Sequence, residues 1–222
     1  MALLHKNISE IPKDAVRISE KEALEYFSKI IDGWKNKSEI WALAYTPGIL
    51  SGAAVCSSVY MNNYFRNKLK LGNYGRLTSY LPAVALPAIM GLVFHTHFVV
   101  PDVILNRNKC PVCVQTRAGL IQAGFSTAYP MLLVPLSAFM FATRHFTYRL
   151  PSAHKEPLEV LKLVQKLFKP ITMQVTVMLA FNVMLAMFLT NKEFEAVHRI
   201  NFKLIEMEKK LESGELPLND SL

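Results

Sequence analysis

The sequence predicts an all-helical membrane protein: a bundle of four transmembrane helices with an amphipathic helix at each end. Two observations support this fold class. The 222-residue chain is 51% hydrophobic and only 19% charged, below the roughly 25% charged residues of a typical soluble domain. Lys, Arg, Asp and Glu are also absent from four windows, residues 40–65, 77–101, 118–143 and 170–191. Each window is long enough to cross a bilayer as a helix, which takes about 20 residues.

The N-terminal segment, residues 1–39, is expected to form an amphipathic helix outside the bilayer. Ser19 and Glu22 have the spacing of a capping box, in which each side chain accepts a bond from the other residue's backbone. Apolar residues then recur at helical spacing from Leu24 to Trp34. This helix either packs against the membrane face or another part of the protein, or docks a partner, and the sequence leaves these readings open.

The transmembrane domain, residues 40–191, begins with a span that carries Gly48, Gly52 and Cys56 at four-residue spacing. Small residues at this spacing form a strip where another helix backbone can approach closely. The approaching helix is either another span of this chain or a helix of a different subunit.

Prolines and amides mark the later spans. Pro82, Pro87, Pro130 and Pro135 each remove a helical hydrogen bond, so kinks are expected in the second and third spans. In the fourth span, Gln174 and Asn182 are expected to hydrogen-bond to neighbouring helices.

The C-terminal segment, residues 192–222, is expected to form a second amphipathic helix. Apolar residues line one side of it from Phe194 to Met207, and Gly214 and Pro217 are expected to end it.

The net charge of +8 is concentrated in two connecting loops, residues 66–76 and 144–169. An even number of spans separates these loops, which places them on the same side of the membrane. Basic loops next to apolar spans are suited to anionic lipid headgroups. Nucleic acid is not an expected partner, because the basic residues form no separate domain.

Cys110 and Cys113 form a Cys-x-x-Cys pair just before the third span. Three roles remain open for it: a structural disulfide or free thiols, a redox-active pair, and half of a zinc site completed by His95 and His97. The two histidines lie two residues apart, on roughly opposite faces of a helix, so we expect no metal site. Arg117 follows the pair and either snorkels to headgroups or anchors a carboxylate or phosphate.

Enzyme signatures are not found in the sequence. It has no glycine-rich phosphate loop and no nucleophile elbow, so we expect neither catalysis nor a cofactor. A small-solute transporter is disfavoured, because ion-coupled transporters generally carry ionisable residues within their spans.

Short blocks of sequence, in the same order along the chain, resemble the transmembrane protein 126 family of mitochondrial inner-membrane proteins. The matching blocks are Phe65-Arg66, Cys110 with Cys113 and Thr116–Leu120, Tyr129-Pro130, and Tyr148 with Pro151, His154 and Lys155. The sequence departs from the family pattern at Asn67, where the family has a second arginine, and at Ser152 and Ala153, which separate Pro151 from His154.

The resemblance implies a multi-pass protein of the mitochondrial inner membrane that acts as an assembly factor, a scaffold or chaperone, for membrane-arm intermediates of respiratory complex I. Its implied partners are complex I membrane-arm subunits, other assembly factors and inner-membrane lipids. A membrane thiol-exchange protein and a permanent complex I accessory subunit are the alternatives. The candidate interaction residues are Gly48, Gly52, Arg66, Arg117, Gly119, Leu120, Tyr129 and Pro130.

Overall fold

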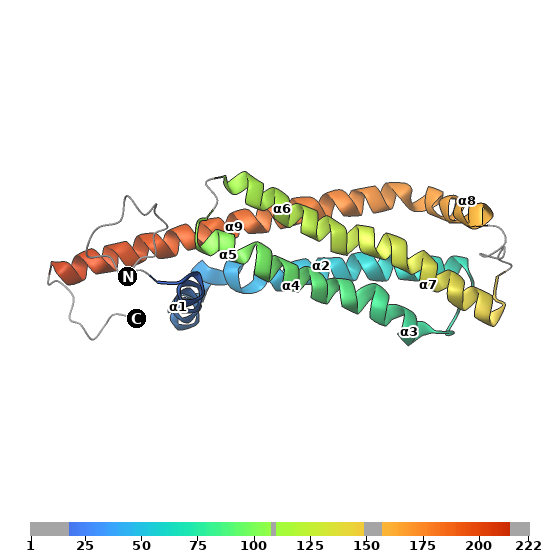
Figure 1. Ribbon diagram of the computed structural model, residues 1–222, viewed down its shortest axis with the longest axis horizontal. Helices are drawn as coiled ribbons and strands as arrows, with labels where there is room; N and C mark the ends of the chain where they lie inside the picture. The colour runs from blue at the N-terminus through green and yellow to red at the C-terminus, as the bar shows by residue number, and fades with distance from the viewer. Residues whose placement is uncertain (1–17, 108–109, 149–156, 214–222) are drawn as a thin grey trace. The chain divides into compact units, whose positions relative to one another are not determined.

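The computed structural model describes residues 18–107, 110–148 and 157–213, and every regular element in them is a helix (Figure 1). Four helical stretches are long and apolar enough to cross a membrane: Lys37–Lys68, Arg76–Ile104, Pro111–His145 and Leu158–Lys210. The predicted fold class, an all-helical protein with four candidate spans, is therefore confirmed.

The helices group into two compact units, each assembled from separate stretches of the chain. The first unit contains residues 1–46, 95–117 and 187–222, and the second contains residues 47–94 and 118–186. Four long helices contribute residues to both units: α2 (Lys37–Lys68), α4 (Leu86–Phe98), α6 (Pro111–Ala123) and α9 (Thr172–Glu212).

In the first unit, helix α1 (Glu20–Gly33) begins with the predicted capping box. The Glu22 backbone N–H donates to the Ser19 hydroxyl over 3.3 Å, and the Ser19 N–H donates to the Glu22 carboxylate over 2.8 Å. These bonds stabilise the ionised carboxylate and lower the pKa of Glu22. The apolar face of α1 is buried, and α1 contacts the short helix α5 (Val100–Ile104).

A second contact of the first unit joins the start of α2 to α9. The Glu39 carboxylate accepts a hydrogen bond from the Trp34 indole N–H over 3.2 Å and pairs with Lys203 over 2.6 Å. Trp34 is buried, so its ring packs inside this unit.

Helix α9 differs from the expected arrangement, because it continues through residue 191 without a break. Residues 172–212 contain neither Gly nor Pro, so nothing in the sequence interrupts the backbone ladder. Its buried side chains continue at helical spacing from Leu189 through Val197 to Leu204. The C-terminal amphipathic segment is thus an extension of the last span, and its predicted end at Gly214 and Pro217 lies outside the described residues.

The second unit also contains α3 (Arg76–Tyr80), α7 (Tyr129–His145) and α8 (Pro157–Phe168). Helix α8 lies in the connection that was expected to be a loop. The apolar core of this unit draws on residues from several helices: Met61, Phe65, Leu69, Leu71, Ala83, Val84, Val134, Ala138, Ala142, Ile171 and Val175.

Two of the four span prolines coincide with π-helical turns. These turns are Leu81–Ala85, which contains Pro82, and Gly124–Ala128, which Pro130 follows closely. At their ends the Leu86 N–H bonds to the Leu81 carbonyl and the Tyr129 N–H to the Gly124 carbonyl, five residues back. A proline has no N–H to donate, and its ring crowds the preceding turn of the helix. The wider π turn relieves this crowding.

The turn between α2 and α3 is built around Arg66, which is only 5% exposed. Its Nη2 atom donates to the carbonyls of Gly72 over 2.7 Å and Tyr74 over 3.0 Å, and Nη1 donates to the Ser79 hydroxyl over 2.9 Å. Without the Arg66 side chain, each of these carbonyls would lose a hydrogen-bond donor. Arg66 therefore acts as an internal clamp and is not exposed for contact with a partner.

Close packing also fixes the end of this turn at Gly75, whose φ is +55°. A Cβ atom built there would lie 2.5 Å from the Phe141 ring. The positive φ and the ring together require glycine at this position.

We predict that Arg66→Met lowers the free energy of unfolding by about 2–4 kcal/mol, because the buried Ser79 hydroxyl and the part-buried carbonyls lose their donor. Lys68→Met is the matched control. It removes an exposed cation two residues away and should change stability by no more than about 0.5 kcal/mol. Thermal unfolding of the purified protein in detergent measures both. Equal losses in the two variants would contradict the clamp.

Candidate functional site

The small-residue strip of α2 faces outward in the second unit. Gly48, Gly52 and Cys56 are all exposed. A Cβ atom built at Gly48 or Gly52 would meet no atom within 4 Å. Among the described residues, no helix approaches either glycine closely, so the strip is open to a helix from another protein or to lipid.

Larger apolar residues flank this strip on the same helix. Ile49 and Tyr60 are also exposed. A strip of small residues next to bulkier apolar side chains is a surface that a second transmembrane helix can pack against, because close backbone approach gives dispersion contacts that lipid tails match poorly.

A buried amide network fixes the opposite face of α2. The Gln122 amide of α6 donates to the Leu50 carbonyl over 2.9 Å and to the Asn182 side-chain oxygen over 3.0 Å. The Asn182 amide of α9 then donates to the Ser57 hydroxyl over 2.9 Å. Asn182 therefore bonds to neighbouring helices as expected, whereas Gln174 is exposed. These bonds fix the rotation of α2 about its own axis. In this orientation Gly48 and Gly52 face outward.

In the first unit, Arg117 anchors a protein carboxylate. Its Nη2 atom pairs with Asp102, whose side chain is 8% exposed. Arg107 lies 3.7 Å from the same carboxylate and 2.5 Å from Glu20, the first residue of α1. This set of charges connects α1, α5 and α6, so Arg117 serves a role inside the fold.

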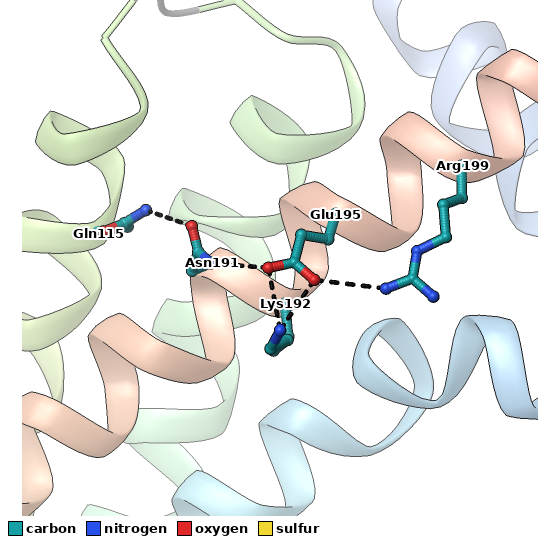
Figure 2. Close-up of polar contacts among 5 residues, drawn as sticks. All are labelled: Gln115, Asn191, Lys192, Glu195 and Arg199. Atoms are coloured by element: carbon teal, nitrogen blue, oxygen red, sulfur yellow. Dashed lines mark hydrogen bonds and ion pairs between the residues drawn. The ribbon is translucent and has the colours of Figure 1, made fainter.

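A second polar chain links α6 to α9 in the first unit (Figure 2). The Gln115 amide donates to Asn191 over 3.1 Å, and the Asn191 amide donates to Glu195 over 3.0 Å. Lys192 and Arg199 pair with the same Glu195 carboxylate at 2.9 and 3.3 Å. These side chains are partly exposed, so water weakens each pair, and the chain mainly helps to fix the positions of these side chains.

The most deeply buried ionisable pair among the described residues is His95 with Glu193, a pairing that no local sequence motif indicates. The two side chains are 2% and 0% exposed, and His95 Nε2 lies 3.2 Å from Glu193 Oε1. The other carboxylate oxygen, Oε2, is buried without a hydrogen-bond partner. Glu193 lies two residues beyond the charge-free window. Its place on the apolar stripe of α9, four residues after Leu189 and four before Val197, is the signal that could have revealed its burial.

Cys110 and Cys113 lie at the start of α6 as exposed free thiols. Their sulfur atoms are 2.6 Å apart, and the Cys113 N–H donates to the Cys110 carbonyl over 3.2 Å. The hydrogen bond from the Cys113 thiol stabilises a thiolate at Cys110 and lowers the pKa of Cys110. His95 points to Glu193 instead of this pair, and no cluster of three or more metal-ligating side chains occurs among the described residues.

The remaining candidate residues differ in exposure. Leu120 is exposed, Tyr129 is half-buried, and Gly119 and Pro130 are buried. Buried positions serve packing, so Leu120 alone among these four offers a side chain to a partner. Pro151, His154 and Lys155, which belong to the resemblance, lie outside the described residues.

We predict that His95→Leu and Glu193→Leu each destabilise the protein by about 3–5 kcal/mol, because either change strands a buried polar partner. The double variant should cost clearly less than the sum of the two, since no stranded group remains. Denaturation in detergent gives the three free energies. Additive losses would show that the two side chains do not interact.

We predict a pH-dependent reactivity at Cys110, measured in a Cys56→Ser background. Because its pKa is lowered, Cys110 should carry more thiolate near neutral pH than an ordinary thiol and react faster with iodoacetamide. Cys113→Ala removes the donor, so the midpoint of the rate–pH profile should move to higher pH. Thr116→Ala, one turn further along, should leave the profile unchanged, and an unmoved midpoint in Cys113→Ala would refute the coupling.

Comparison with known proteins identifies the family to which this chain is similar. The family model described as "Transmembrane protein 126" matches residues 24–207. A Drosophila melanogaster protein named "Transmembrane protein 126" is 42% identical over 218 residues, covering 98% of this chain and 98% of that protein. No solved structure matches the chain.

Proposed function

Because the chain belongs to the transmembrane protein 126 family, we propose that it is an assembly factor of the mitochondrial inner membrane. In this role it binds membrane-arm intermediates of respiratory complex I, together with other assembly factors, and shields their lateral surfaces until the next subunits arrive. The four candidate spans make it a multi-pass membrane protein, as this role requires.

The exposed glycine strip of α2 carries the proposal. Gly48 and Gly52 have open space above them, so a transmembrane helix of an unfinished subunit can approach the α2 backbone directly. Small-residue faces are the common device for helix association in lipid, where the hydrophobic effect between helices is absent. Exposed Ile49 and Tyr60 would add contact area at the sides of the docked helix.

A lasting subunit of the mature complex would use the same surface, so the proposal must be tested by following the protein through assembly. Complexome profiling of detergent-solubilised mitochondria resolves the masses of the complexes that contain this chain. Migration with partial complexes alone is the expected result. Migration with the finished complex would make it a permanent subunit, and migration with neither would refute the complex I role.

We predict that Gly52→Leu reduces co-purification of complex I membrane-arm subunits at least about tenfold, the equivalent of about 1.4 kcal/mol. A Cβ atom at this position meets no atom of the described residues within 4 Å, so the fold should persist. Ala180→Leu is the matched control, since it enlarges an exposed small residue in the apolar first part of α9 and should leave co-purification unchanged. Unchanged recovery of partners with Gly52→Leu would remove the strip as the docking face.

Thiol exchange remains a second candidate because the Cys110 and Cys113 sulfurs are in contact and exposed. The variant with both cysteines changed to serine separates the two functions. An assembly scaffold should keep its partners and support complex I formation at the wild-type level. Loss of complex I with partners still bound would favour exchange over scaffolding.

A further inference from the structure

Three segments of the chain meet in the second unit: the end of α2 with the turn that follows it, the end of α7, and helix α8 (Figure 1). The Tyr74 ring stacks on His145 with centroids 4.5 Å apart. The Tyr64 hydroxyl donates to the Leu167 carbonyl over 3.0 Å. These contacts create one surface, which we call the basic end.

Exposed cations surround this surface: Lys68, Lys70, Arg76, Arg144, Lys166 and Lys169. None of them forms an ion pair with a carboxylate of the described residues. Within the described part of the second unit, Glu159 is the sole acidic residue. The positive charge of the basic end is therefore not neutralised by the residues that the structure describes.

Helix dipoles account for only part of this charge. Lys68 and Arg144 lie in the last turns of α2 and α7, where a cation is favoured by the partial negative charge of the helix end. Arg76 instead begins the helical stretch Arg76–Ile104, where the helix end repels a cation. Lys162 and Lys166 are four residues apart on α8, a spacing at which like charges also repel. An external anion would relieve both repulsions.

Large apolar side chains stand exposed among these cations. Leu77 is 81% exposed, Phe146 is 92% exposed and Leu158 is 71% exposed. Each lies within a few residues of a basic residue or on α8 itself. A free phosphate or a polynucleotide would leave these side chains in water, whereas a phospholipid offers acyl chains to them and a phosphate to the cations.

We propose that the basic end is a binding site for anionic phospholipids, with Lys70, Arg76, Lys166 and Lys169 contacting headgroup phosphates. Leu77 and Phe146 lie against the acyl chains just below. The site depends only on the protein being in a membrane and is independent of the proposed role in complex I assembly.

The test is lipid retention by the full-length protein in detergent, measured by native mass spectrometry. Equal amounts of phosphatidylglycerol and phosphatidylcholine are the probes. Wild-type protein should retain phosphatidylglycerol preferentially. The variant K70Q/R76Q/K166Q/K169Q should lose this preference by about tenfold or more, because each basic residue near an anionic surface contributes measurably to binding.

The matched control is K21Q/K29Q/K35Q/K209Q, which removes the same charge from exposed positions of the first unit and should retain the preference. An equal loss in both variants would show a net-charge effect and overturn the site. The variant K70R/R76K/K166R/K169R retains the charges and should bind as wild type, which separates loss of charge from misfolding. Displacement of the lipid by millimolar inorganic phosphate would also overturn the phospholipid site.

Discussion

A polar group that is buried in a membrane helix must find its partner inside the protein, and the rest of this structure depends on that constraint. Gln122, Asn182 and Ser57 satisfy it together, because each contributes a donor or acceptor that the surrounding lipid could not replace. Arg66 satisfies it in another way, by donating to turn carbonyls that would otherwise lack hydrogen bonds at the end of α2. These bonds fix which face of α2 points inward.

The fixed inward face determines what the outside of the protein can do. Since Leu50 and Ser57 are held by the amide network, Gly48 and Gly52 on the opposite side of α2 face outward. The same clamp at Arg66 orders the turn that presents Lys70 and Arg76 at the surface. The docking strip and the basic end are therefore consequences of inward hydrogen bonding, and each can be altered without removing a buried partner.

The charge-free windows and the Ser19–Glu22 capping box could be predicted from the sequence, because both depend on local patterns that solvent or lipid enforces directly. The π-helical turns could not be predicted, because a proline indicates that a helix is disturbed but not which backbone geometry accommodates it. The burial of Glu193 was missed for a different reason. A carboxylate just beyond an apolar window is normally expected to be solvated. Its partner, His95, is brought to it only by the tertiary fold. The exposure of the glycine strip likewise required the tertiary arrangement.

The carboxylates of the described residues are distributed unevenly between the two units. This distribution affects which molecules the surface of each unit can bind. All of the ion pairs found among these residues lie in the first unit, where Asp102, Glu39 and Glu195 each hold a cation. The described second unit holds exposed cations with one acidic residue among them. The ion pairs of the first unit are satisfied within the fold and help to hold its helices together. The second unit offers two outward surfaces: the glycine strip of α2, which suits a partner helix, and the exposed cations of the basic end beside apolar side chains, which suit anionic lipid.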